Sequence, residues 1–177
     1  MENTPFLFAL QKISTEQFAL NEDVLNLDCN INLSSKFKFG IVPENRILAV
    51  SVKFMFEKES NPFIIVEVVC NFDIEQKSWN NYFSSEKKQI VIPKDIAIHL
   101  LFLSIGTTRG VLHAKTENTA YNKYFLPTLD VSKSILEDIV VKSNWGRIGS
   151  WNQFFNRNQT SKEINFIKEE IADMYIL

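Results

Sequence analysis

Long runs in which every second residue is apolar constrain this chain more than any other feature of its sequence. The clearest run carries apolar residues on one side and mostly Asn and Asp on the other; the apolar ones are Leu25, Leu27, Cys29, Ile31 and Leu33. A period of two is that of a β-strand with one face on a core and the other in water. We therefore predict a long strand here, with a β-bulge at Ser34-Ser35 before Phe37 and Phe39.

Two more alternating runs, Leu48–Phe56 and Ile64–Ile74, follow at short intervals. Turns are predicted between the three runs, at 40–45 and at 57–62, where Pro, Asn and Ser gather. Three long strands in succession joined by short turns favour an antiparallel meander. The polar stretch that follows, 76–89, has no stable period and is predicted to be a long loop or a short helical excursion.

A shorter alternating run opens the chain. Phe6, Phe8 and Leu10 alternate with more variable neighbours as far as Thr15, which predicts a first strand. A polar connection is then expected to lead to Asp23. The first strand therefore precedes the meander by a long connection.

A long, largely buried helix is predicted after Pro93, whose fixed φ suits the first turn of a helix. Its apolar sector holds Ile96, Ile98, Leu100, Leu101, Phe102, Leu103 and Ile105. Gly106 and Gly110 lie four residues apart, and each costs a helix about 1 kcal/mol relative to Ala. Two explanations stay open: another backbone approaches closely, or Gly110 ends the helix as its C-terminal cap.

Two further helices are predicted in the C-terminal third. The first has Asp130 or Ser132 as its N-cap and contains Ile135, Ile139 and Val140. The second begins at a capping box formed by Thr160 and Glu163 and carries one apolar face, made of Ile164, Ile167, Ile171 and Met174. An Asn-rich linker between them holds Trp145, Trp151, Phe154 and Phe155. We interpret 1–142 as one domain and 143–177 as an extension.

Charge and cysteine content narrow the function classes. The 177 residues carry 19 basic and 21 acidic side chains, interspersed, with a pI of about 5.8, which argues against a nucleic-acid partner. Cys29 and Cys70 have no second pair with which to build a zinc site, so buried free thiols in a cytoplasmic protein are expected. The start lacks the basic region of a secretory signal and is expected to be a mature N-terminus. The apolar stretch Ile96–Ile105 is about half the ~20 residues that a membrane helix needs, so no membrane insertion is predicted.

Catalytic signatures are missing from the sequence. His99 and His113 are the two histidines, and on one helix they would lie about 21 Å apart, too far to share a metal. No G-x-S-x-G, P-loop or H-E-x-x-H motif occurs. His99 is expected to be a core or interface residue. We therefore predict a non-enzyme without cofactor or metal.

Large aromatic side chains fall in segments predicted to be connections, where they are less expected than in strands or helices. They are Phe18, Tyr121, Tyr124 and Phe125. Two readings stay open: each ring anchors its loop in the core, or together the rings form an apolar groove.

Two segments resemble the bacterial export chaperone family SecB. The first is similar to that family's opening strand and reads Phe8-Ala9-Leu10-Gln11-Lys12-Ile13-Ser14-Thr15. The second is similar to its long helix and reads Leu103-Ser104-Ile105-Gly106-Thr107-Thr108-Arg109-Gly110, followed by an irregular stretch to Tyr124-Phe125-Leu126-Pro127. The order of one strand, a long connection, a three-stranded meander and a long helix also agrees, so the resemblance covers roughly Phe6 to Val140.

The resemblance implies an α+β fold: a four-stranded antiparallel Greek-key sheet with a long helix packed on one face. It also implies a homo-oligomer, a dimer or tetramer assembled through sheet edges and the long helix, with Leu103, Gly106 and Gly110 at the contact. Unfolded polypeptide would lie in a groove lined by Phe18, Leu20, Tyr121, Tyr124, Phe125 and Leu126. Export-type members are strongly acidic, which suits docking to the SecA motor, whereas this chain's net charge is −2; SecA engagement is left open.

Two functions follow from the resemblance. The first is an ATP-independent chaperone that binds extended clients, either broadly in protein export or as the dedicated partner of one antitoxin or secreted protein. The second is an adaptor or structural subunit that reuses the fold. The extension 143–177 is expected to dock into the chain's own groove or a neighbour's and regulate access.

Overall fold

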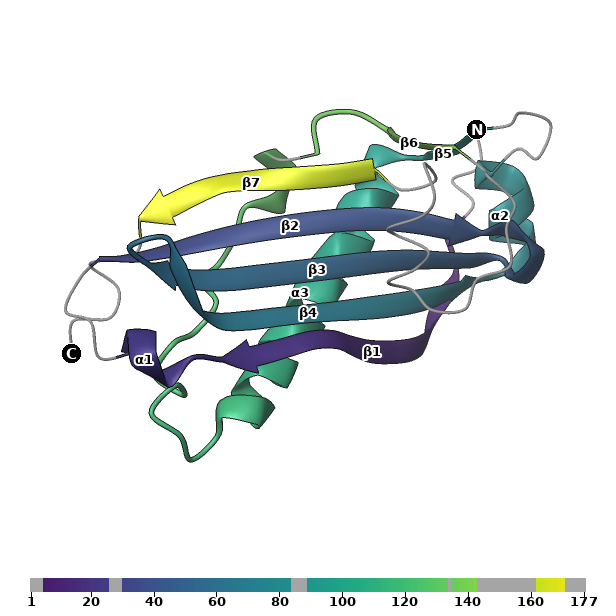
Figure 1. Cartoon of the computed structure of the whole chain (residues 1–177). Coiled ribbons are helices and arrows are strands. Elements are labelled where there is room, and N and C mark those ends of the chain that lie inside the picture. Colours follow the sequence, from purple (N-terminus) through teal and green to yellow (C-terminus); the bar gives the residue numbers. More distant parts are fainter. Residues whose placement is uncertain (1–4, 26–29, 84–88, 134, 143–161, 171–177) are drawn as a thin grey trace.

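The computed structural model of the chain describes residues 5–25, 30–83, 89–133, 135–142 and 162–170. Strands are the main elements of these ranges, with one long helix, α3 (Figure 1). The elements are β1 (Phe8–Leu20), α1 (Glu22–Leu25), β2 (Ile31–Val42), η1 (Pro43–Asn45), β3 (Ile47–Lys58), β4 (Asn61–Ile74), α2 (Gln76–Tyr82), β5 (Gln89–Ile92), α3 (Lys94–Thr116), η2 (Val131–Lys133), β6 (Ile139–Lys142) and β7 (Lys162–Glu170).

The strands form an antiparallel sheet in the order β1-β4-β3-β2-β7, and β5 pairs with β6 in a second, two-stranded sheet. Strands β2, β3 and β4 are the predicted meander, and its last strand, β4, lies beside β1. Helix α3 crosses one face of this sheet diagonally (Figure 1). The predicted α+β class, with four antiparallel strands in Greek-key order and a long helix on one face, is confirmed.

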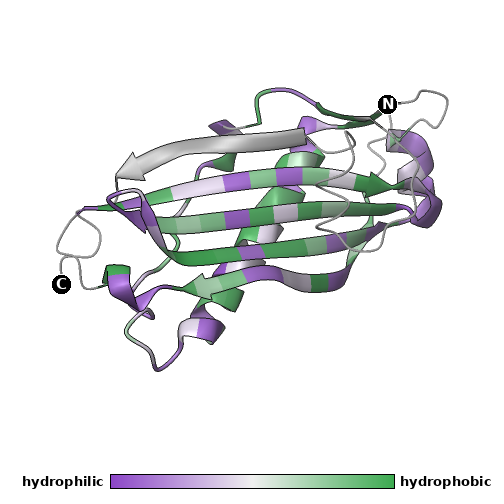
Figure 2. Cartoon of the chain, viewed as in Figure 1, coloured by the Kyte–Doolittle hydropathy of each residue, from purple (hydrophilic) through white to green (hydrophobic). Residues whose placement is uncertain are grey.

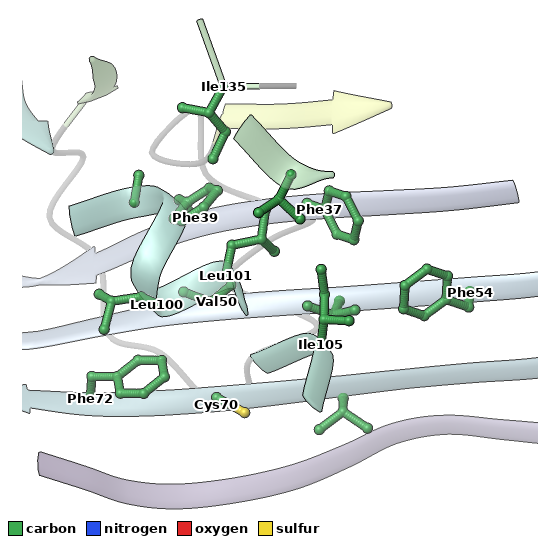
Figure 3. Packing of buried hydrophobic residues seen from close by; sticks show 14 of the residues in the cluster. Phe37, Phe39, Val50, Phe54, Cys70, Phe72, Leu100, Leu101, Ile105 and Ile135 are labelled. Carbon is green, nitrogen blue, oxygen red and sulfur yellow. The ribbon is translucent and has the colours of Figure 1, made fainter. Parts of the chain in front are cut away.

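The core lies between α3 and the sheet. Apolar and polar residues alternate along parts of β2, β3 and β4 (Figure 2). Every second side chain of a strand points to the same face, here the face covered by the helix. Rings from the strands meet aliphatic side chains of α3 there, and the main participants are Phe37, Phe39, Phe54, Phe72, Leu100, Leu101 and Ile105 (Figure 3). Cys70 faces the same side (Figure 3), where its thiol is hydrogen-bonded to Ser104 and Thr107 of α3.

The opposite face of β3 and β4 carries a polar network. Ser51 donates a hydrogen bond of 3.0 Å to the carboxylate of Glu67, which is 6% exposed. The Lys53 ammonium lies 3.7 Å from the same carboxylate and donates to Gln17 of β1 at 2.7 Å. A buried carboxylate is tolerated only with such partners, so the network also joins β1 to the central strands.

Two connections are tighter than the sequence suggests. β3 and β4 meet at Glu59 and Ser60, which have φ angles of 50° and 67°. Positive φ at both central residues is the geometry of a two-residue hairpin whose twist matches the strands. At the start of α3, the Lys94 amide donates to the Asp138 carboxylate at 2.9 Å, so a residue just before β6 caps the helix.

Several local predictions are wrong. β1 continues through the expected polar connection to Leu20, and Leu25 lies in α1 rather than in a strand. The register of β2 with β3 runs unbroken through Ser34-Ser35, so no bulge occurs in that pairing. α3 extends six residues past Gly110, which is therefore not its cap.

The predicted second helix is also wrong, since the chain forms the single turn η2 and then β6, which pairs with β5. The predicted C-terminal helix is replaced over 162–170 by β7, which pairs with the edge of β2. Thr160, Ile171 and Met174 lie outside the described residues, as do the aromatic residues of the linker, Leu27 and Cys29.

Candidate functional site

An aromatic cluster at one end of the sheet joins the loop after α3 to the hairpin of β3 and β4. The Tyr124 ring lies 4.9 Å from the Phe63 ring at an interplanar angle of 71°, and 6.1 Å from the Phe56 ring. Edge-to-face pairs at this distance stabilise beyond their buried area. Together with the buried Tyr121 these residues form what we call the end cluster.

The loop that carries Tyr121 and Tyr124 is held by hydrogen bonds to its backbone carbonyls and to that of Thr116. The Tyr124 amide donates to the Tyr121 carbonyl at 3.0 Å, and the Thr119 hydroxyl donates to the Thr116 carbonyl. Arg109 of α3 donates to two carbonyls further along, those of Leu126 at 3.3 Å and Pro127 at 3.0 Å. The irregular segment thus has a fixed position relative to α3, which a binding surface on a loop requires.

Phe18 and Leu20 reach the same end of the sheet from β1. They are paired with Val66 and Ile64 of β4, and both are partly buried against the core. Because they lie inside a strand, the prediction that Phe18 belongs to a connecting segment is wrong. The prediction that the end of the first strand and the loop after α3 approach each other has support, because carboxylates of α1 act electrostatically on Tyr121.

Three lysines surround these rings. The ammonium groups of Lys58, Lys115 and Lys123 lie 5.3–5.6 Å from the centroids of Phe63, Phe18 and Tyr124, respectively. A cation over a ring face at this distance is attracted to it. Lys115 and Lys123 are exposed and form a basic rim beside the end cluster, whereas Lys58 is 6% exposed and donates to the Leu25 carbonyl.

The six residues predicted to bind polypeptide differ in exposure. Phe125 is 53% exposed, whereas Tyr121, Tyr124 and Leu126 are 3–4% exposed. Phe18 and Leu20 lie between these extremes. Anchoring in the core, the first of the two readings, describes the two tyrosines. Phe125 is the one member of the set whose ring stands mainly in solvent.

The three residues predicted at an oligomer contact share the face of α3 that points away from the sheet. Leu103 is 40% exposed, and Gly106 and Gly110 are exposed. A Cβ added at either glycine would meet no atom within 4 Å. Packing within the chain therefore does not explain why two glycines stand where Ala would favour the helix.

The sequence did not reveal a strip of apolar residues between β1 and α3. Leu10 and Ile13 are each 47% exposed and pair with Phe72 and Cys70, whose side chains face α3. They therefore project on the helix side of the edge strand β1. The spacing of three between Leu10 and Ile13 broke the alternation and marked the register shift found there. We call Leu10 and Ile13, on the helix side of β1, the β1–α3 strip.

Other exposed apolar side chains lie apart from the end cluster and the strip. Phe102, expected to be buried, is 61% exposed on the outer side of α3. Val91 of β5 and Val140 of β6 are paired and are 40% and 43% exposed. Leu136, just before β6, is 76% exposed.

Titratable groups give no sign of a catalytic centre in the described ranges. No group of three potential metal ligands occurs there. His99 is exposed with its ring 5.6 Å from that of Phe8, so the core alternative is wrong and the interface alternative stays a prediction. His113 contacts Asn122 at 3.1 Å. Burial raises the pKa of the Cys70 thiol and of the Tyr121 and Tyr124 hydroxyls. Each of these groups is held in its neutral form.

No protein-family model, curated protein or solved structure matches the chain. By length and composition, one described helix could cross a membrane: α3 has 23 residues and a mean hydropathy of 1.3 over its most apolar window. Nine of its residues are buried, and packing against the sheet accounts for their apolar character equally well.

Proposed function

We propose that the protein binds extended or unfolded polypeptide at the surface around Phe125, beside the end cluster, without ATP, and so acts as a chaperone. The observation that carries this proposal is Phe125, a ring 53% exposed on a hydrogen-bonded loop, next to the buried Tyr124. Exposed large aromatics on a positioned loop are typical of interaction sites.

Burial of client side chains supplies the driving force. A phenylalanine buries about 200 Å² when covered, so the exposed half of Phe125 offers about 100 Å², or about 2.5 kcal/mol at 25 cal/mol per Å². Such contacts tolerate many sequences because they are not directional. The basic rim of Lys115 and Lys123 favours apolar segments with acidic residues beside them.

A homo-oligomer, dimer or tetramer, is part of the proposal. The β1–α3 strip lies on an edge strand whose far side has no partner among the described strands. On the face of α3 that points away from the sheet, Gly106 and Gly110 leave space for a close backbone approach. Burial of the strip by a second copy would cover an exposed edge and place several end clusters in one particle, which multiplies weak client contacts.

Suppression of aggregation tests this function. The full chain is mixed at equimolar ratio with two unrelated proteins during thermal unfolding, without ATP, and light scattering is recorded. We expect reduced scattering with both, a weaker effect for Phe125→Ala, and an unchanged effect for Leu136→Ala, which removes an even more exposed apolar side chain elsewhere.

The alternative, an adaptor or structural subunit, gives a different outcome. An adaptor would leave the aggregation of both proteins unchanged while still forming a complex with one folded partner. Scattering that is the same with and without the wild-type chain would reject the chaperone proposal.

A further inference from the structure

The fifth strand of the sheet comes from outside the predicted domain. β7 pairs antiparallel with β2 over Asn32–Phe39 and occupies the edge that the four-stranded sheet would otherwise leave open (Figure 1). It is separated from β6 by 19 residues, 143–161. An open edge presents unpaired N–H and C=O groups that accept any extended backbone, so β7 is one occupant of a general acceptor.

The sequence of this segment does not favour a strand. Lys162–Glu170 contains five charged residues among nine, and the spacing of Thr160 and Glu163 is the sequence pattern of a helix capping box. Its apolar residues Ile164, Ile167, Ile171 and Met174 recur with the period of a helix. Local preference therefore opposes the observed conformation, which is maintained by pairing with β2.

The pairing itself is incomplete. The register between β2 and β7 shifts between Leu33 and Ser35, whereas β2 pairs with β3 without interruption at the same place. β7 also leaves the end of β2, from Gly40 to Val42, unpaired on that side. An edge strand with an irregular and incomplete pairing belongs to the low-stability part of a fold.

The register also defines what the edge selects. Glu163 stands across from Lys38, and Ile164 stands across from Phe37, which lies fully in the core. Residues directly opposite in an antiparallel pair share one face, where opposite charges attract and apolar pairs pack. A competing strand would therefore carry an acidic residue next to an aliphatic one.

We propose that the edge of β2 is a second polypeptide-binding site, occupied in cis by β7 and opened to extended acidic–aliphatic segments when β7 leaves. Binding occurs by strand addition, with backbone hydrogen bonds giving affinity and the positions opposite Phe37 and Lys38 giving selectivity. Release returns the segment to its helical preference. This site is separate from the end cluster and does not depend on client binding there.

Two neighbouring proline substitutions test the proposal in the full chain. Successive residues of an antiparallel strand alternate in pointing their N–H toward the partner, so only one of Ile164→Pro and Asn165→Pro removes a donor to β2. That variant should release β7, seen as faster amide exchange at Ser34–Phe39. The other variant is its matched control. Circular dichroism and urea unfolding verify that both remain folded.

The readout is binding of a fluorescent peptide with the sequence of residues 162–170. A tethered strand competes at an effective concentration in the millimolar range, so the peptide should bind the releasing variant at least about tenfold more tightly than wild type. It should also restore protection at Ser34–Phe39, whereas a scrambled peptide should not. In the releasing variant, Lys38→Glu should shift preference about threefold toward a peptide with Lys in place of Glu163.

Three results would overturn the proposal. If neither proline changed amide exchange at Ser34–Phe39, β7 would not protect this edge. If the released edge bound the peptide no better than the scrambled peptide, it would not be a selective acceptor. If wild type bound the peptide as tightly as the releasing variant does, β7 would not occupy the edge in cis.

Discussion

Tyr124 and Phe125 are neighbours in sequence with opposite environments, and their alanine variants should separate stability from binding. Tyr124 is 3% exposed and its ring contacts those of Phe63 and Phe56, whereas Phe125 is 53% exposed. Truncation of a buried aromatic residue costs about 3–5 kcal/mol because contacts are lost and a cavity remains. Truncation of a half-exposed ring costs about 1 kcal/mol.

Tyr124→Ala should therefore lower the free energy of unfolding by about 3–4 kcal/mol, which for a chain of this length lowers the Tm by about 10 °C. Urea unfolding gives this free energy directly, and an unchanged slope in denaturant would show that the native and unfolded states stay comparable. Phe125→Ala should shift the Tm by no more than about 3 °C.

Client binding should show the reverse order. Loss of the exposed half of the Phe125 ring removes up to about 2 kcal/mol of burial, or about thirtyfold in affinity for a permanently unfolded protein. Tyr124→Ala, measured well below its Tm, should weaken binding less. Equal destabilisation by both variants would refute the assignment of Tyr124 as a buried residue and Phe125 as an exposed one. Unchanged affinity for Phe125→Ala would refute its role in binding.

Three further predictions concern other parts of the molecule. Gly106→Ala with Gly110→Ala should raise helix stability by about 1 kcal/mol per site, since an added Cβ meets nothing within the chain, while lowering the native mass by weakening contact between copies; native mass spectrometry that finds the mass unchanged would remove the glycines from that contact. Asp138→Ala should cost about 1 kcal/mol in urea unfolding by uncapping α3, with Asp138→Asn closer to wild type. Burial raises the pKa of Cys70, Tyr121 and Tyr124, so the folded chain keeps protons that the unfolded chain releases, and the contribution of these three groups to stability should be constant below about pH 8 and decline as pH rises above 9; a urea midpoint that does not fall between pH 8 and 11 would contradict the burial of these groups.

Alternation and turn chemistry were sufficient to predict the centre of the fold. The runs around Leu48–Phe56 and Ile64–Ile74 send every second side chain toward α3, and a slip of one residue would turn all of them to the opposite face, so the period of two is strongly specified. Pro93 marked the residue before α3 correctly. These features are local, and a single sequence reveals them.

The errors fall where pairing between distant segments overrides local preference. Residues 162–170 have helical period and a capping box, but the open edge of β2 pairs them as a strand. Glu16 and Gln17 look like a polar connection, yet pairing with β4 extends β1 through them. Neither partner is visible in the local pattern, because cross-strand hydrogen bonds depend on which edge is free.

The candidate site was predicted in part for a similar reason. Aromatic residues at 121, 124 and 125 marked the correct loop, but residue type alone does not tell a buried ring from an exposed one. Tyr124 is buried because its ring packs against those of Phe63 and Phe56, whereas the next residue, Phe125, is half-exposed. Leu10 and Ile13 were missed because an exposed edge strand carries the same apolar residues as a buried one.

Site-directed photo-crosslinking tests the central claim most directly. A photoreactive phenylalanine analogue is placed at position 125. In a separate control it replaces Leu136, an exposed apolar residue elsewhere. The chain is then illuminated with an unfolded protein present. The account predicts capture of the unfolded protein from position 125, little from position 136, and loss of capture when the same protein is folded. Equal capture from both positions, or none from position 125, would contradict it.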